Sequence, residues 1–259
     1  NSRKVGRFEN MFLEGRPPIG FGVTSSGDLL GGTQITFSDL LGDQQFSVMA
    51  MSVSQYRTLG FSYANLASRF QFAIQGYSQD QFFYGFAPGS LFDPNLAFLS
   101  RDDAIATRTV RGGSIYGIYP FDRFRRIEFS AGVFNYQERF NNAALEQQSN
   151  DFQQQYYGAQ IFRNGMFLPL GISFVQETTV FREYGPLSGN TMRVDYVYAP
   201  SVGNLLSRQT VDLDTRFYQR LGENGVLALR SRAFKSWGEF PDFLYFGGNS
   251  EMRGYDYLQ

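Results

Sequence analysis

The sequence predicts an all-β protein, specifically a transmembrane antiparallel β-barrel, and three observations lead to this prediction. Aromatic residues make up 17% of the 259 residues, yet mean hydropathy is only −0.29 and charged residues are 18%, below the roughly 25% of soluble domains. No stretch approaches the roughly 18 uninterrupted apolar residues that a membrane helix requires. Apolar and polar residues instead alternate with a period of two along much of the chain, which is typical of strands with two different faces.

Composition argues against several classes of function. The net charge is −1, from 23 basic and 24 acidic residues, and no basic block indicates a nucleic-acid surface. The chain has neither Cys nor His, which excludes disulfide frameworks, thiol nucleophiles, imidazole zinc sites and Ser-His hydrolases. The sequence also contains no recognisable phosphate loop or metal-ligand cluster. We therefore expect no enzymatic activity, no cofactor, no metal and no nucleic-acid partner.

Eleven segments carry strand signals, each near the roughly 9 to 11 residues that cross a bilayer at a tilt. The alternation is clear at residues 69–77, where Phe70, Phe72 and Ile74 share one face. A soluble β-sandwich would alternate in the same way, so the pattern alone does not show a membrane. The expected strands are 18–25, 32–39, 44–55, 58–66, 69–78, 104–119, 124–137, 170–182, 190–198, 207–220 and 226–237.

The connections favour the barrel, because short turns fall at every second one. Short periplasmic turns and long extracellular loops are the asymmetry of outer-membrane barrels. Residues 1–15 are accordingly expected to be a periplasmic lead-in, and 149–163 an extracellular hairpin arm within a long loop. The expected short turns are 41–43, 67–68, 120–123, 185–189 and 222–225, and the longest loops are 79–103, 138–169 and 238–259.

A charge ladder is expected in the lumen. Asp212, Asp214 and Arg216 share one face of a strand whose hairpin partner carries Arg230 and Arg232 on one face, so opposite charges would lie side by side. They should face inward, because a charge facing lipid costs about 2 to 4 kcal/mol at the midplane. A solvated structural ladder is favoured here over a substrate or ion pathway.

The first expected strand alternates apolar residues with glycine, in the order Ile19, Gly20, Phe21, Gly22, Val23. Glycine weakens a strand and leaves one face bare. The bare face is expected at a seam between strands that opens. It is equally expected where the strand packs closely against an inserted loop. Two aromatic clusters, at 82–84 and 243–246, are either rings at the membrane interface or the core of a loop.

The last segment carries a more specific pattern. Gly247 and Gly248 are followed, after a short spacer, by Met252-Arg253-Gly254-Tyr255. This resembles the signature of the BamA-type surface-antigen superfamily, in which a Gly-Gly pair precedes an apolar residue and Arg-Gly-Phe or Arg-Gly-Tyr. Residues 31–43 and 185–189 look like the subgroup that follows a TolB-like propeller.

The resemblance implies a sixteen-stranded barrel with the motif on the sixth extracellular loop, after strand eleven. Residues 16–259 would then be a partial barrel that ends in this lumen loop, with five further strands in roughly a hundred residues beyond Gln259. The first strand would meet the last at a weak seam that opens laterally. An open sheet edge is untenable in lipid, so other strands must complete the sheet.

The resemblance also implies roles for the motif residues. Arg253 would enter the lumen and pair with an acidic residue of a later strand, since a buried guanidinium needs a carboxylate or several carbonyls. Gly254 would allow close approach of the backbone, Tyr255 would pack against the lumen wall, and Gly247 and Gly248 would serve turn geometry. The alternative is that Arg253 is an ordinary exposed loop arginine.

The expected location is therefore the bacterial outer membrane, with membrane lipids as partners. Three functions remain open. The resemblance implies insertion of outer-membrane proteins or translocation of polypeptides, with unfolded outer-membrane proteins as clients. The alternatives are a structural or anchoring barrel that binds other subunits of an envelope complex, and a soluble all-β sandwich or binding module.

Overall fold

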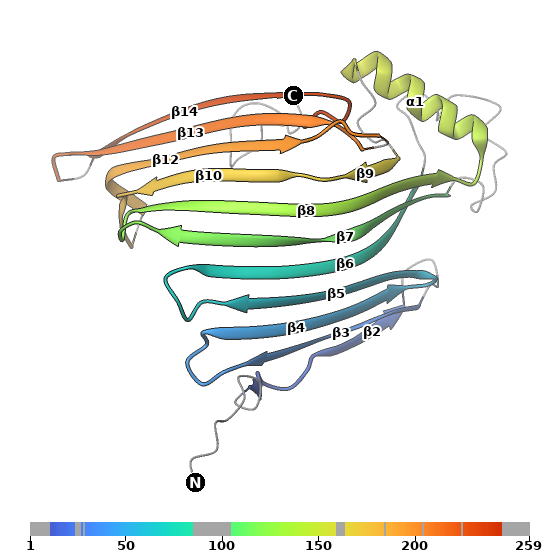
Figure 1. Cartoon of the computed structure of the whole chain (residues 1–259), viewed down its shortest axis with the longest axis horizontal. Coiled ribbons are helices and arrows are strands. Elements are labelled where there is room, and N and C mark those ends of the chain that lie inside the picture. The colour runs from blue at the N-terminus through green and yellow to red at the C-terminus, as the bar shows by residue number, and fades with distance from the viewer. Residues whose placement is uncertain are drawn as a thin grey trace, which may run out of the picture.

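The structure, a computed structural model, describes residues 11–23, 27, 29–84, 105–158, 164–183, 185–203, 205–223 and 225–244. Within these residues, 14 strands form one sheet and a single helix lies beside one end of it (Figure 1). The elements are β1 (Phe12–Leu13), β2 (Ile19–Val23), β3 (Leu29–Ser38), β4 (Gln44–Val53), β5 (Tyr56–Asn65), β6 (Gln71–Tyr84), β7 (Ile105–Pro120), β8 (Arg125–Phe140), α1 (Ala143–Tyr157), β9 (Gly165–Phe167), β10 (Leu170–Glu177), β11 (Val180–Arg182), β12 (Gly185–Ala199), β13 (Arg208–Leu221) and β14 (Gly225–Trp237).

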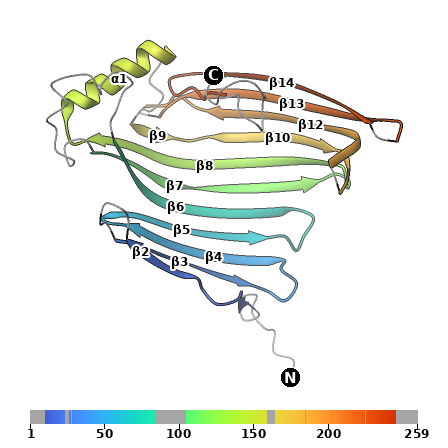
Figure 2. The same ribbon diagram turned by 180° about the vertical axis from the view of Figure 1, so that it is seen from behind.

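The prediction of an all-β antiparallel fold is confirmed. Each of the eleven expected segments contains a strand, and from β2 to β14 these strands pair with their neighbours in sequence order. The short strands β1, β9 and β11 pair with β3, β8 and β12. The described sheet is open, because β14 at one edge has no pairing with β1 or β2 at the other (Figures 1 and 2).

Short turns gather at one end of the sheet, and the helix and the longer connections lie at the other (Figure 1). The β4–β5 connection at the helix end is an exception to this sorting, because it is only Ser54–Gln55. The turn predicted at 185–189 is wrong, because these residues begin β12. After an irregularity, β11 continues the course of β10 and pairs with β12, with Arg182 opposite Gly185, so the chain reverses between these two residues.

The expected hairpin arm at 149–163 is also wrong, because α1 occupies most of this stretch. The side chain of Asn142 caps the helix by accepting a hydrogen bond from the Ala144 backbone N–H at 2.9 Å, and Gly158, with φ +70°, ends it. Both are favoured capping residues. Leu145 is buried, at 3% exposure. No helix in the described part of the chain is long and apolar enough to span a membrane.

The sheet has two chemically different faces. Successive residues of a strand point to opposite sides, and the register aligns one apolar set across all the long strands. On this outer face Phe70, Phe129 and Phe217 are 47%, 43% and 43% exposed, so no second sheet covers them. The opposite, inner face holds the buried polar residues Ser114 and Thr210, as expected on the concave side of a curved sheet.

The polarity of the two faces reverses part of the way along β8. From Ile127 to Val133 the apolar residues have odd numbers and lie on the outer face, whereas Phe134 and Tyr136 point inward while Asn135 and Gln137 point outward. Pairing with β7 runs through this point without a register shift. The half of β8 near the turns therefore has an apolar exterior, and the half near α1 has a polar exterior over an apolar interior.

Candidate functional site

The inner face of the sheet carries an array of ion pairs on its later strands. Asp214 on β13 accepts hydrogen bonds from Arg216 on the same strand and from Arg230 on β14, each with an N–O distance of 2.9 Å. Asp212 pairs with Arg232 at 2.6 Å. The structure thus brings together all five residues of the expected ladder, on the face where they were expected.

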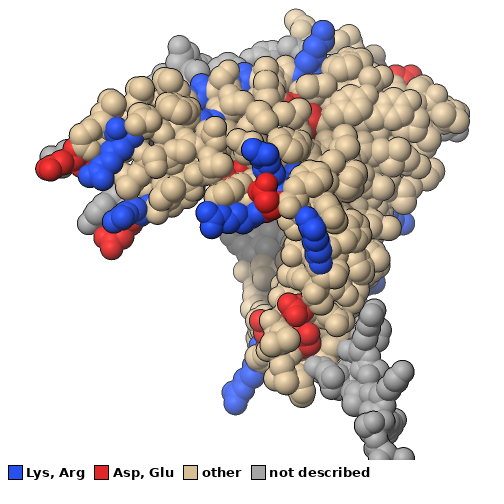
Figure 3. Space-filling model, turned by 60° about the vertical axis from the view of Figure 1, so that its left-hand side comes forward, with Lys and Arg blue, Asp and Glu red and all other residues tan. Residues whose placement is uncertain are grey.

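The array continues on β12 and β8 through four residues that the sequence analysis did not join to it. Arg193 contacts Asp195 at 2.8 Å and Glu128 at 3.0 Å, and Glu128 also contacts Arg126 at 2.6 Å. Register places Arg193 opposite Asp214 and Asp195 opposite Asp212, so these pairs lie beside the ladder. In Figure 3 acidic and basic side chains lie next to one another in the hollow of the sheet.

The carboxylates of this array are less exposed than the guanidinium groups. Asp214 and Asp212 are 16% and 19% exposed, whereas Arg216 is 43% exposed. Five arginines surround four carboxylates, so the array has a net charge of +1. Each of the four carboxylates contacts at least one of these arginines. The ion pairs join β8 to β12 and, separately, β13 to β14, and no described carboxylate of the array lacks an arginine partner.

We expect Asp214→Ala to destabilise the barrel by about 1 to 3 kcal/mol, because it removes the carboxylate that both Arg216 and Arg230 contact across the β13–β14 pair. The measurement is the urea midpoint of the folded, heat-modifiable form of the full-length protein in detergent. The triple variant Asp214→Ala, Arg216→Gln, Arg230→Gln should recover part of the loss. If the single variant unfolds at the wild-type midpoint, the array contributes no stability.

The expected seam strand forms an interrupted edge. β2 pairs only with residues 29–33 of β3, and β1 pairs with residues 37–38. Between β1 and β2 lie Gly15, with φ +74°, and the prolines Pro17 and Pro18. Proline lacks the N–H that a strand ladder needs and is tolerated at sheet edges. Few backbone hydrogen bonds therefore hold this edge.

The side chains of β2 agree with the alternation seen in its sequence. Ile19, Phe21 and Val23 point outward and are 74%, 86% and 65% exposed. Gly20 and Gly22 lie on the inner face. Among the described residues, a Cβ atom on Gly20 would have no neighbour within 4 Å, and one on Gly22 would meet only Leu30. Nothing described packs tightly against the bare face of this strand.

An aromatic cluster closes the helix end of the inner face, and the sequence analysis did not identify it. Its centre is Phe167, only 2% exposed, whose ring lies 5.6 Å from that of Phe240 and 6.2 Å from that of Tyr136. The Arg208 guanidinium lies over the Phe167 ring at 4.4 Å. We call this group, together with Phe134, Ala199 and Leu206, the mouth cluster. It joins β8, the β12–β13 connection and the segment after β14.

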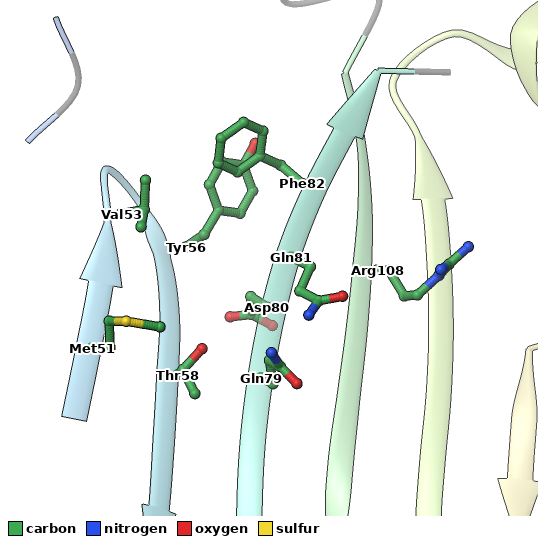
Figure 4. A pocket seen from close by; sticks show the side chains of 9 residues that line it. All are labelled: Met51, Val53, Tyr56, Thr58, Gln79, Asp80, Gln81, Phe82 and Arg108. Atoms are coloured by element: carbon green, nitrogen blue, oxygen red, sulfur yellow. The ribbon is translucent and has the colours of Figure 1, made fainter. Parts of the chain in front are cut away.

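A pocket of about 360 Å³ opens at the helix end of the sheet, between β4 and β7 (Figure 4). The rings of Tyr56 and Phe82 stack at its edge, with centroids 4.7 Å apart. Its remaining lining is mixed: two residues are apolar, three carry amide or hydroxyl groups, and Asp80 and Arg108 are charged. Arg108 pairs with Glu138 at 2.6 Å. Of the two aromatic clusters noted in the sequence, the first thus contributes Phe82 to a ring pair within the sheet. The described residues contain no group of His, Cys, Asp and Glu that would hold a metal ion.

The lumen-loop motif, Gly247, Gly248, Met252, Arg253, Gly254 and Tyr255, lies outside the described residues. Among the described residues, the chain crosses the sheet eleven times from β2 to β14, and residues 238–244 follow β14 at the end where α1 lies.

The fold is similar to that of a solved BamA structure. A match to the crystal structure of BamA from Haemophilus ducreyi lacking POTRA domains 1–3 has a TM-score of 0.56 and 14% sequence identity, and covers 93% of this chain and 46% of that chain. This chain therefore spans about half the length of that structure. At this identity the likeness shows a BamA-like barrel fold alone. No protein-family model and no curated protein matches the sequence.

Proposed function

We propose that this chain forms the larger part of an outer-membrane barrel that inserts outer-membrane proteins or translocates polypeptides, without a cofactor. The proposal rests on the combination of two features in one sheet. The sheet has an exposed apolar exterior, and its first strand is weakly paired at the edge. The exterior suits lipid. The edge suits exchange of strand partners, because an unpaired strand edge is a template for another strand.

The energetics of β2 support the exchange step. The strand has only five residues, two of them glycine, and Pro17 and Pro18 separate it from β1. Separating β2 from a partner strand would break few hydrogen bonds, and an incoming client strand would replace them. In this proposal residues 1–15 lead in from the periplasm, and Arg253 anchors the sixth loop in the lumen.

The test is the folding of an unfolded outer-membrane barrel protein into phosphatidylcholine liposomes that contain the full-length protein. We expect faster folding than in empty liposomes. Depletion of the protein in its host should also lower the level of folded outer-membrane proteins. Unchanged folding rates and unchanged levels would contradict the proposal and favour an anchoring barrel.

A substitution in β2 tests the role of the edge. Gly20→Val adds a strand-favouring side chain where no described atom lies within 4 Å of the new Cβ. Stiffening the edge by about 1 kcal/mol should slow client folding roughly fivefold. Ser62→Val, on the inner face of β5, is the control, because that strand is paired on both sides and its substitution should leave the rate unchanged. Equal rates for Gly20→Val and wild type would remove β2 from the mechanism.

A further inference from the structure

The outer face of β6, β7 and β8 changes character along the strands. The register links Gly76, Gly113 and Val133 in one row, and this is the last apolar row. The next row is Ser78, Arg111 and Asn135, followed by Asp80, Thr109 and Gln137. The third row holds Thr107 and Arg139, with Phe82 as its member on β6. The eight polar residues of these rows form one group. We call these eight residues the outer polar wall. It extends for roughly 13 Å along the strands from its first row to its third, at about 3.3 Å per residue.

Two observations place this wall just outside the hydrocarbon layer. It lies directly beyond Ile115 and Val133, which are 53% and 44% exposed on the same face. On the reverse side of β8, at the same level, Phe134 and Tyr136 pack in the mouth cluster. An apolar interior under a polar exterior is the arrangement of a protein wall in water or among polar headgroups.

The two arginines on the wall differ from those of the inner array, because no described carboxylate pairs with them. Arg111 and Arg139 are exposed, and neither forms a salt bridge or side-chain hydrogen bond with another residue in the part of the chain that the structure describes. The arginines of the inner array, by contrast, all contact carboxylates. The one acidic residue of the wall, Asp80, accepts a hydrogen bond from the Thr109 hydroxyl at 2.8 Å.

The same excess of positive charge recurs around this end of the outer face. Arg57 at the start of β5 and Lys235 near the end of β14 also point outward there, and the Lys235 ammonium lies 5.9 Å from the Trp237 ring. Among described strand residues on this half of the outer face, four are basic and only Asp80 is acidic. A basic rim at the upper edge of an apolar belt complements an anionic headgroup layer.

We infer that the outer polar wall binds the phosphorylated headgroup of a glycolipid in the outer leaflet, with Arg111 contacting a phosphate. This inference rests on the proposed location in the outer membrane. Arginine suits this role because its planar guanidinium donates two parallel hydrogen bonds to phosphate. Arg111 lies in the first polar row, at the level where headgroup phosphates adjoin the hydrocarbon. Asn135, beside it in the register, supplies a neutral amide donor, and Arg139 stands two rows further out.

The test measures lipid A retained by the full-length protein after reconstitution into phosphatidylcholine bilayers that contain lipid A. Wild type should retain it, and Arg111→Gln should retain at least fivefold less. Arg111→Lys should recover part of the binding. The matched control is Arg125→Gln, which removes an outward arginine at the opposite end of β8 and should retain as much as wild type. Each variant is first checked for the heat-modifiable, folded form.

Two further arms identify the ligand. Dephosphorylated lipid A should be retained no better than phosphatidylcholine, and inorganic phosphate at millimolar concentration should not displace lipid A. Equal retention of the dephosphorylated lipid, displacement by free phosphate, or equal loss in Arg111→Gln and Arg125→Gln would each overturn the inference. The client-folding assay uses liposomes without lipid A, so its failure and the failure of this inference are distinguishable.

Discussion

Phe129→Arg is expected to reduce the folded barrel severely, whereas Ser130→Arg, one residue further along β8, is expected to fold. Phe129 points outward and is 43% exposed, opposite Gly117 and Ile172 in the register. Ser130 points to the inner face, toward the ion-pair array. An arginine facing lipid at the midplane costs about 2 to 4 kcal/mol, and one facing the lumen does not.

The measurement is the fraction of heat-modifiable protein after refolding of the full-length chain into liposomes, with both variants treated identically. A loss of about one and a half to three orders of magnitude in the folding equilibrium for Phe129→Arg corresponds to this cost. If the outer face met water, an arginine there would be harmless. Equal folding of the two variants would therefore contradict the membrane interpretation of the outer face.

The second large effect is expected at the mouth cluster. Phe167→Ala should destabilise the helix end of the sheet by about 3 to 5 kcal/mol, because truncating a fully buried phenylalanine removes its packing and leaves a cavity. The Phe167 ring packs against the rings of Tyr136 and Phe240 and beneath the Arg208 guanidinium. An alanine side chain is too short to reach any of these three groups.

Limited proteolysis of the folded protein in detergent, together with its urea midpoint, measures this change. New cleavage is expected in the β8–β10 and β12–β13 connections, which the cluster joins. Phe217→Ala is the comparison, since its ring is 43% exposed on the outer face and its removal leaves no buried cavity. Retention of wild-type protease resistance in Phe167→Ala would show that the cluster does not hold these connections.

Period-two alternation was sufficient to predict most of the fold. Alternate residues of a strand face different environments, so the polarity of its residues alternates along the sequence. This alternation located the eleven strands that cross the described sheet in succession, and it placed Asp212, Asp214 and Arg216 on one face. It did not locate α1, whose residues are mostly Gln, Asn and Ala and carry only a weak apolar stripe. The signals that were available there were local, namely Asn142 as a cap and Gly158 at the end.

The limits of the site prediction have a different cause. Arg126, Glu128, Arg193 and Asp195 were each visible on the polar side of an alternating segment, but their grouping depends on the register between strands that are far apart in the sequence. The mouth cluster is similar, since Phe167 and Phe240 lie in irregular segments with no periodicity. The turn expected at 185–189 was wrong because glycine and proline usually indicate a turn. Here Gly185 and Pro186 are the first residues of β12, and they pair with β11.

For the proposed membrane barrel, the reversal of polarity within β8 would fix how deeply the protein sits in a bilayer. Sliding outward by one pleat repeat, about 7 Å, would lift Val133 and Ile115 into water. Sliding inward by the same amount would immerse Arg111 and Asn135 in hydrocarbon. Both displacements raise the free energy, so the polarity pattern of the strand sets the immersion depth. A membrane of a different thickness would have to deform to match this pattern.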